Sequence, residues 1–274
     1  MDCAFLKMEH NKNKGTNRMI EHAPIRDPVA LAPGLVRGIG ASDRTPRWSP
    51  GLALDCPYAE LFAPARDASG AGMALALARD ALRQQQAAAV PDQRPFLWVQ
   101  DKAALRLSGR PYLPGLPADL RHRLIHVAAA TPEDALFALE EGLRCRDLAF
   151  VIGELAGNPR ALDFTASRRL SLAAEKHGLP LWLIRLDARR DLGAARMRWE
   201  VAPAPSFRPR WNSHAPGKPS WRADLFRAHT FHPGQWILRD DDALLVAEPA
   251  LPESRTPDHG DLVHGSGDRS LAAG

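Results

Sequence analysis

The chain has 274 residues, of which 45% are hydrophobic and 25% charged, and its formal net charge is +4. This composition is typical of a mildly basic globular protein, and the length allows one large domain or two small ones. No run approaches the ~18 apolar residues that a membrane helix needs, so no membrane partner is expected. Cys3, Cys56 and Cys145 lie far apart without a Cys-x-x-Cys pair, which argues against a disulfide framework or structural zinc.

Both ends of the chain lack the hydrophobic periodicity of helices and strands. Residues 1–47 contain eight Lys and Arg against five acidic residues, and we expect a disordered basic segment there. Residues 248–274 contain two Arg against five acidic residues, and we expect a disordered acidic tail. The first residues also lack the apolar core of a secretory signal, so a cytoplasmic protein is expected.

The region between these ends, residues 48–247, begins with a predicted strand, a glycine-containing loop and a helix. The loop "ARDASGAG" follows the apolar run 59–63 and opens a helix over 70–86. A phosphate-binding loop has this layout, with the motif Gly, four residues, Gly-Lys-Ser/Thr.

The loop departs from that motif at the positions that do the chemistry. Ala65 stands at the first glycine position and Gly70 at the second, whereas Ala71 takes the lysine position and Gly72 the hydroxyl position. The loop therefore supplies neither the charge that binds phosphate nor the hydroxyl that binds magnesium. The sequence favours a simple strand-to-helix turn over a site of ATP hydrolysis.

Strands and helices then alternate. Buried strands are predicted at 95–100, 123–129, 148–155 and 179–187, and helices from Thr131-Pro132 and over 165–177. After residue 187 the pattern changes, and strands without intervening helices are predicted at 195–203, 220–229, 235–240 and 243–248. The expected fold is α/β, with a mostly parallel sheet flanked by helices and a C-terminal antiparallel extension.

Two acidic residues follow predicted strands at places where nucleotide hydrolases carry functional carboxylates. Glu154 ends the strand 148–155 and is a candidate for holding a metal, the alternative being a cap or a pair with an arginine. Asp101 follows the strand 95–100, and its alternative is a helix cap or a turn residue.

Basic and aromatic residues interleave through residues 203–239. This mixture is typical of a nucleic-acid site, where bases stack on aromatic rings and cations neutralise phosphates. It is equally typical of a protein-docking surface. The third alternative is that the aromatic residues only close the edge of the sheet. A further basic pair, Arg168 and Arg169, lies on the helix 165–177. Neighbours on a helix point about 100° apart, so one arginine can face a partner while the other pairs with Glu175 or faces solvent.

Several segments together resemble the ImuA family, RecA-like proteins of damage-inducible mutagenesis cassettes that are related to the SulA division inhibitors. They are "GAGMALALA", "LWVQD", "PYLPGL", "ALFALEEGLR", "AFVIGELAG", "FTASRRLSLAAEKHG", "LPLWLIR", "ARMRWEVAPAPS" and "WRADLFRA", covering roughly residues 57–247. The most specific of these combine "EEGLR", "VIGEL" and "TASRRLSLAAE".

The resemblance implies a RecA-like core that has lost its ATPase chemistry. The loop 65–72 takes the place of the phosphate loop, and Gln100 or Asp101 stands near the catalytic glutamate position. The metal-aspartate position falls near Gly153, and residues 188–194 are short where a recombinase has a longer DNA-binding loop. We therefore expect a pseudo-ATPase without a cofactor, kept as a docking module.

The resemblance also implies a process and partners. Members of this family work with a Y-family-like polymerase homologue and an error-prone replicative-type polymerase during SOS lesion bypass. We expect a non-catalytic accessory protein of translesion synthesis, associated with the nucleoid when DNA is damaged, with RecA and single-stranded DNA as further candidate partners. By position, docking is expected within 195–247, where the candidates are Arg208, Arg210, Trp211, Trp221, Arg222, Arg227 and Trp236.

Two other functions remain open at this stage. One is a divergent, DNA-stimulated ATPase that uses Arg66, Ser69 or Glu154 in place of the missing groups. The other is a SulA-like inhibitor of cell division. The altered loop argues against the first, and the match through "EEGLR" and "TASRRL" favours the mutagenesis role over the second.

Overall fold

The computed structural model describes residues 46–51, 57–85, 92–207, 209, 212, 214–241 and 244–250. They belong to the unit Thr45–Gly274. Apart from residues 46–47 and 248–250, the two terminal segments discussed above lie outside the described residues, as do Arg208, Arg210 and Trp211. None of the described helices is both long and apolar enough to cross a membrane.

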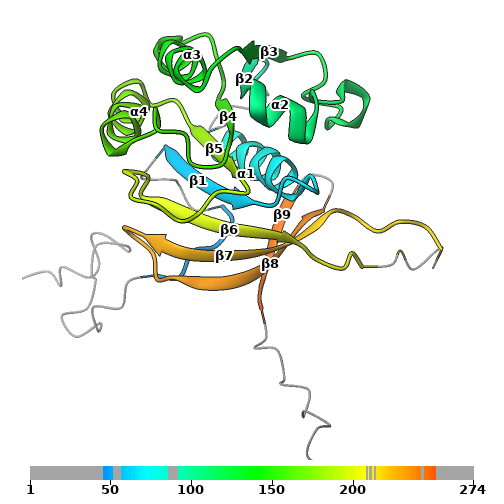
Figure 1. Ribbon diagram of the computed structural model, residues 1–274. Helices are drawn as coiled ribbons and strands as arrows, with labels where there is room; N and C mark the ends of the chain where they lie inside the picture. The colour runs from blue at the N-terminus through cyan, green and yellow to red at the C-terminus, as the bar shows by residue number, and fades with distance from the viewer. Residues whose placement is uncertain are drawn as a thin grey trace, which may run out of the picture. The chain divides into compact units, whose positions relative to one another are not determined.

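The described residues form one nine-stranded sheet in the order β3-β2-β4-β5-β1-β6-β7-β8-β9, shown in Figure 1. The elements in chain order are β1 (Tyr58–Ala63), α1 (Ser69–Gln85), β2 (Phe96–Asp101), α2 (Lys102–Ser108), the 3-10 helix η2 (Leu113–Gly115), β3 (Leu124–Ala129), α3 (Pro132–Arg144), β4 (Val151–Ala156), α4 (Phe164–His177), β5 (Leu181–Leu186), β6 (Met197–Pro203), β7 (Ser220–Ala228), β8 (Gly234–Asp241) and β9 (Leu244–Pro249).

The sheet has a parallel part and an antiparallel part. The parallel part contains β3, β2, β4, β5, β1 and β6 in that order. The antiparallel part consists of three successive pairs, β6–β7, β7–β8 and β8–β9. The expected fold class, a mostly parallel α/β sheet with a C-terminal antiparallel extension, is confirmed. The sheet continues past residue 247, because the Ala250 N–H still donates to the Gln235 carbonyl at 3.0 Å.

Two cores cover the two faces of the sheet. In β1, Ala59, Leu61 and Ala63 join the core beneath α1, whereas Tyr58 joins the core beneath α3 and α4. This alternation follows from the two-residue period of a strand, and burial on both faces explains the continuous apolar runs in the sequence.

The helix starts are set by local capping. The Thr131 hydroxyl accepts the Asp134 N–H at 3.1 Å, so the predicted start of α3 is confirmed. Helix α4 begins one residue before the prediction, since the Asp163 carboxylate accepts the Ala166 N–H at 2.7 Å. Gly178 ends α4 with φ at +63°. The sequence prediction missed the short helix α2, for which Asp101 is the N-cap.

The antiparallel extension is closed by tryptophans, which corrects one expectation. Trp221 and Trp236 are candidates for partner contact by sequence, yet each is only 6% exposed and belongs to the core beneath α1, as the alternative of a structural role requires. Trp236 contacts Trp48 edge-on at 5.7 Å and Trp199 at 5.8 Å between ring centroids. The extension must bury one face of its strands, and these rings provide that face.

Candidate functional site

Gly70 and Gly72, in the first turn of α1, are packed against neighbouring side chains. A Cβ atom on Gly70 would lie 2.8 Å from Ala63 Cβ and 2.9 Å from Ile184 Cγ2, so glycine lets α1 approach the sheet. A Cβ on Gly72 would lie 2.9 Å from Cζ2 of Trp221. The position that carries the magnesium-binding hydroxyl in a phosphate loop therefore has no room for a side chain unless a core tryptophan moves.

Aspartate carboxylates accept hydrogen bonds from backbone N–H groups of the β1–α1 loop. The Ala65 N–H donates to Asp187 Oδ1 at 3.0 Å, and the Ser69 N–H donates to Asp67 Oδ1 at 3.0 Å. The Gly72 N–H is bound to the Ala68 carbonyl at 2.8 Å. A phosphate-binding loop instead aims free N–H groups at its anion. The amides of Ala65 and Ser69 are thus already bound to carboxylates rather than free to bind a phosphate.

Glu154 lies in a cavity of about 490 Å³ beside this loop, which is also lined by Ala71, Gly72, Trp98 and Gln100. Its Oε2 accepts the Trp98 indole N–H at 3.2 Å and the Gln100 amide at 2.7 Å. Burial raises the pKa of the carboxyl, against the lowering effect of hydrogen bonds from Ser108, Trp98 and Gln100. Glu154 is thus held by neutral donors, and the expected alternatives of a helix cap or an arginine pair do not apply.

Asp101 takes the structural role named as its alternative. Its Oδ1 accepts the Ala104 N–H at 2.7 Å at the start of α2. Its neighbour Gln100 bridges Glu154 and His126, with 2.8 Å between Gln100 Oε1 and His126 Nε2. Within the described part of the chain, no three His, Cys, Asp or Glu side chains gather in a group that could hold a metal ion.

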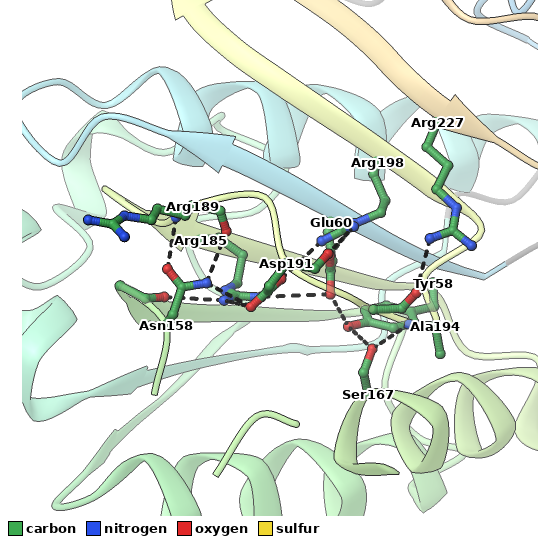
Figure 2. Close-up of polar contacts among 12 residues, drawn as sticks. Tyr58, Glu60, Asn158, Ser167, Arg185, Arg189, Asp191, Ala194, Arg198 and Arg227 are labelled. Atoms are coloured by element: carbon green, nitrogen blue, oxygen red, sulfur yellow. Dashed lines mark hydrogen bonds and ion pairs between the residues drawn. The ribbon is translucent and has the colours of Figure 1, made fainter. Parts of the chain in front are cut away.

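A second polar cluster, which sequence reasoning missed, lies beneath the connection from β5 to β6 (Figure 2). Strands β5 and β6 are parallel and lie on either side of β1, so residues 187–196 must cross over β1. Such crossovers are usually helices, which bury apolar side chains against the sheet. Here the face of β1 under the crossover carries Glu60, which is fully buried.

Two arginines neutralise this glutamate. The Arg198 Nε donates to Glu60 Oε2 at 2.7 Å, from the residue that faces Glu60 in the parallel register. Arg185 Nη1 lies 3.9 Å from Glu60 Oε1, and its guanidinium carbon lies 5.5 Å from the centre of the Phe62 ring. Both arginines are buried, so the cluster has little access to solvent screening.

Asp191 is the second acid that pairs with Arg185 and Arg198, and it fixes the crossover to the sheet. It accepts from Arg185 Nη2 at 2.9 Å and from Arg198 Nη2 at 3.1 Å, while its carbonyl accepts from Arg198 Nη1 at 2.6 Å. Burial alone would raise the pKa of Asp191, but the hydrogen bond and charge of Arg185, with a hydrogen bond from Asn158, lower it. Asn158 also binds both backbone groups of Arg189, at 2.9 Å and 2.8 Å.

The cluster continues to helix α4. The buried Tyr58 hydroxyl donates to Glu60 Oε1 at 2.9 Å and lies 3.4 Å from the Ser167 hydroxyl. Ser167 accepts the Ala194 N–H at 2.9 Å, and the Arg227 guanidinium donates to the Gly193 carbonyl at 3.4 Å. Figure 2 shows the contacts from Glu60 through Tyr58 and Ser167 to Ala194 as one chain. The crossover is therefore fixed at both ends.

Part of this chain is similar in sequence to known proteins. No protein-family model matches the chain. Two curated relatives, named Protein ImuA and from two strains of Caulobacter vibrioides, are each 35% identical to it over 173 residues, which is 60% of this chain and 67% of the relative. The chain belongs to the ImuA family.

In this ImuA-family chain the two arginines of α4 diverge as the sequence predicts. Arg169 Nε pairs with Glu140 Oε1 of α3 at 2.7 Å. Arg168 instead lines a groove between α4 and the crossover. The expected pairing with Glu175 is wrong, because Glu175 pairs with Arg196 at 2.8 Å.

The remaining partner candidates of the ImuA-family chain are dispersed. Arg227 is exposed and lines the same groove as Arg168, whereas Arg222 is exposed on β7. Trp221 and Trp236 are core residues, so their rings offer no stacking surface. The structure thus brings together Arg168 and Arg227, which lie far apart in the sequence.

Proposed function

We propose that this chain is a non-catalytic, RecA-like accessory protein of damage-inducible mutagenesis. Membership of the ImuA family supports the process. The observation that carries the non-catalytic part is the contact between Gly72 and Trp221, which fills the hydroxyl position of a phosphate loop with a core ring.

Other parts of the former nucleotide region support the same conclusion. The lysine position is Ala71, so the cation that a phosphate loop places against the β- and γ-phosphates is missing from its usual position. Asp67 and Asp187 bind amides of the loop, and Glu154 is enclosed by Trp98 and Gln100. Positioning and charge stabilisation are nearly all that an ATPase supplies, and each of these parts is altered.

The action we propose is docking onto a Y-family-like polymerase homologue, with an error-prone replicative-type polymerase in the same assembly. RecA and single-stranded DNA are further proposed contacts. Two features support a binding role: the crossover is held by hydrogen bonds at residues 191, 193 and 194, and Arg168 of α4 has no hydrogen-bonding or ionic partner among the described residues. A surface that is already ordered loses little entropy when a partner binds.

The test is two measurements on the purified full chain. ATP turnover, with and without single-stranded DNA, should equal that of a buffer blank under conditions in which RecA hydrolyses ATP. The polymerase homologue of the same bacterium should bind saturably in biolayer interferometry.

Other results would change the assignment. DNA-stimulated turnover that disappears in Glu154→Ala would establish the divergent ATPase instead. Binding to the division tubulin, together with no binding to the polymerase homologue, would establish the SulA-like role.

A further inference from the structure

A groove of about 600 Å³ runs between α4, the end of the crossover and the end of β7. Its walls come from three elements that are distant in the sequence. The lining residues are Phe164, Arg168, Ser171, Leu172, Glu175, Gly193, Ala194, Ala195, Arg196, Arg227, Ala228 and His229. The volume is that of a site for a few side chains rather than a surface irregularity.

One wall of the groove carries large apolar side chains that face solvent. Phe164 and Leu172 are 51% and 53% exposed, and with Arg168 they occupy positions i, i+4 and i+8 of α4. Residues at this spacing follow one another along the same side of a helix. Ala194, Ala195 and Ala228 form the opposing apolar surface.

The groove is also cationic. Arg168, Arg196 and Arg227 stand against a single acid, Glu175, which is already paired with Arg196. Among the described residues Arg168 has no hydrogen-bonding or ionic partner, and Arg227 has one carbonyl contact. The guanidinium groups of Arg168 and Arg227 therefore lie beside the apolar wall with N–H donors that a ligand can use.

The groove is held in shape before any partner arrives. Residues 193 and 194 are tied to Arg227 and Ser167, and Ser167 leads through Tyr58 to the buried Glu60 (Figure 2). A binding surface that is already ordered does not spend binding energy on ordering itself.

We propose that this groove binds an acidic segment of a partner protein that carries one or two large apolar side chains. The apolar side chains lie between Phe164, Leu172 and the alanines, and carboxylates of the segment bind Arg168 and Arg227. This inference rests on the proposed function, because it takes the partner to be a protein, and it adds where and by what chemistry that partner binds. A nucleic acid fits less well, because Phe164 is the one hydrocarbon ring among the described residues of the lining, whereas single-strand tracks stack bases on several rings.

Two variants of the groove and two matched controls test the proposal. The groove variants are Arg168→Glu and Leu172→Ala. The controls are Arg169→Glu, the neighbouring arginine that pairs with Glu140 outside the groove, and Phe137→Ala, an exposed apolar residue of α3. Thermal unfolding of each variant establishes that it is folded before binding is measured.

The probes are the polymerase homologue and three labelled ligands. The ligands are a twelve-residue peptide of Asp, Glu, Leu and Phe, the same peptide with Lys for each acid, and oligo(dT). We expect the acidic peptide and the homologue to bind the wild type, and Arg168→Glu to weaken both by about tenfold or more. The controls should change each affinity by less than about twofold, and the basic peptide should not bind.

The outcomes separate this inference from the proposed function. If the homologue binds all the variants equally, docking lies elsewhere and the groove proposal is overturned while the function stands. If the acidic peptide binds through the groove but the homologue does not bind at all, the groove proposal stands and the named partner is wrong. Failure of the acidic peptide to bind, or binding of oligo(dT) with the same dependence on Arg168, overturns the groove proposal.

Discussion

At the scale of single residues, Gly72 packs against Trp221 at the position where a phosphate-binding loop carries its magnesium-binding hydroxyl. Gly72→Thr should destabilise the chain by about 1–3 kcal/mol, the usual cost of overpacking, because the new Cβ meets Trp221. Urea unfolding measures the change. The control Arg66→Thr, at an exposed position of the preceding loop, should stay within ~0.5 kcal/mol.

The same contact makes the two residues interdependent. Gly72→Thr combined with Trp221→Ala should cost less than the sum of the two single changes, since the second removes the obstacle to the first. A Gly72→Thr variant as stable as the wild type would mean that Trp221 moves aside freely.

Glu154 should make stability depend on pH. Burial raises its pKa above the ordinary value of 4.5, so the folded chain binds a proton that the unfolded chain has released. The stabilisation is present below about pH 4.5 and is lost as pH rises through the raised pKa. Relative to Glu154→Gln, the wild type should lose stability in urea unfolding as the pH rises from about 4.5 through the raised pKa. Parallel curves for the two proteins would contradict the buried, titrating carboxyl.

At the scale of elements, the crossover between β5 and β6 depends on buried charge. Glu60→Gln leaves Arg185 and Arg198 with Asp191 as their remaining acid, and should cost about 3–5 kcal/mol in the free energy of unfolding. Glu141→Gln, which removes an exposed pair with Arg144, should change it by less than ~0.5 kcal/mol. Equal effects in the two variants would show that the buried cluster adds nothing to stability.

The strands and the long helices were predictable because each carries its signal locally. Apolar runs gave the parallel strands, and Thr131 with Pro132 gave the start of α3. Helix α2 was missed because its seven residues are too few for a periodic pattern. Alternation in "WRADL" also indicates that Trp221 lies on the same face of β7 as Ala223 and Leu225, a signal that would have identified it as a core residue.

The polar cluster was not predictable from local patterns. Glu60 and Arg198 are 138 residues apart, and they meet because the strand order places β6 beside β1. The motif alone indicates that the lysine and hydroxyl of a phosphate loop are missing at Ala71 and Gly72. It cannot indicate that Trp221 packs against Gly72, because Trp221 comes from β7, which is distant in the sequence. Sequence patterns thus indicated which groups are missing and could not indicate what replaces them.

At the scale of the whole described unit, the antiparallel extension and the parallel sheet are interlocked. Trp221 of β7 packs on α1, and Trp236 of β8 packs on Trp48 and on Trp199 of β6. The extension is therefore part of the main core rather than an added module. A substitution in it is expected to affect the region around the β1–α1 loop as well.

The contact between Gly72 and Trp221 also bears on the direction in which such a protein can evolve. Restoring a hydroxyl at position 72 strains the core while Trp221 is present, and removing Trp221 first opens a hole in that core. Either step alone should lower the free energy of unfolding before any nucleotide chemistry is gained. Under the non-catalytic role proposed above, this contact makes a binding surface easier to refine in this fold than a nucleotide site.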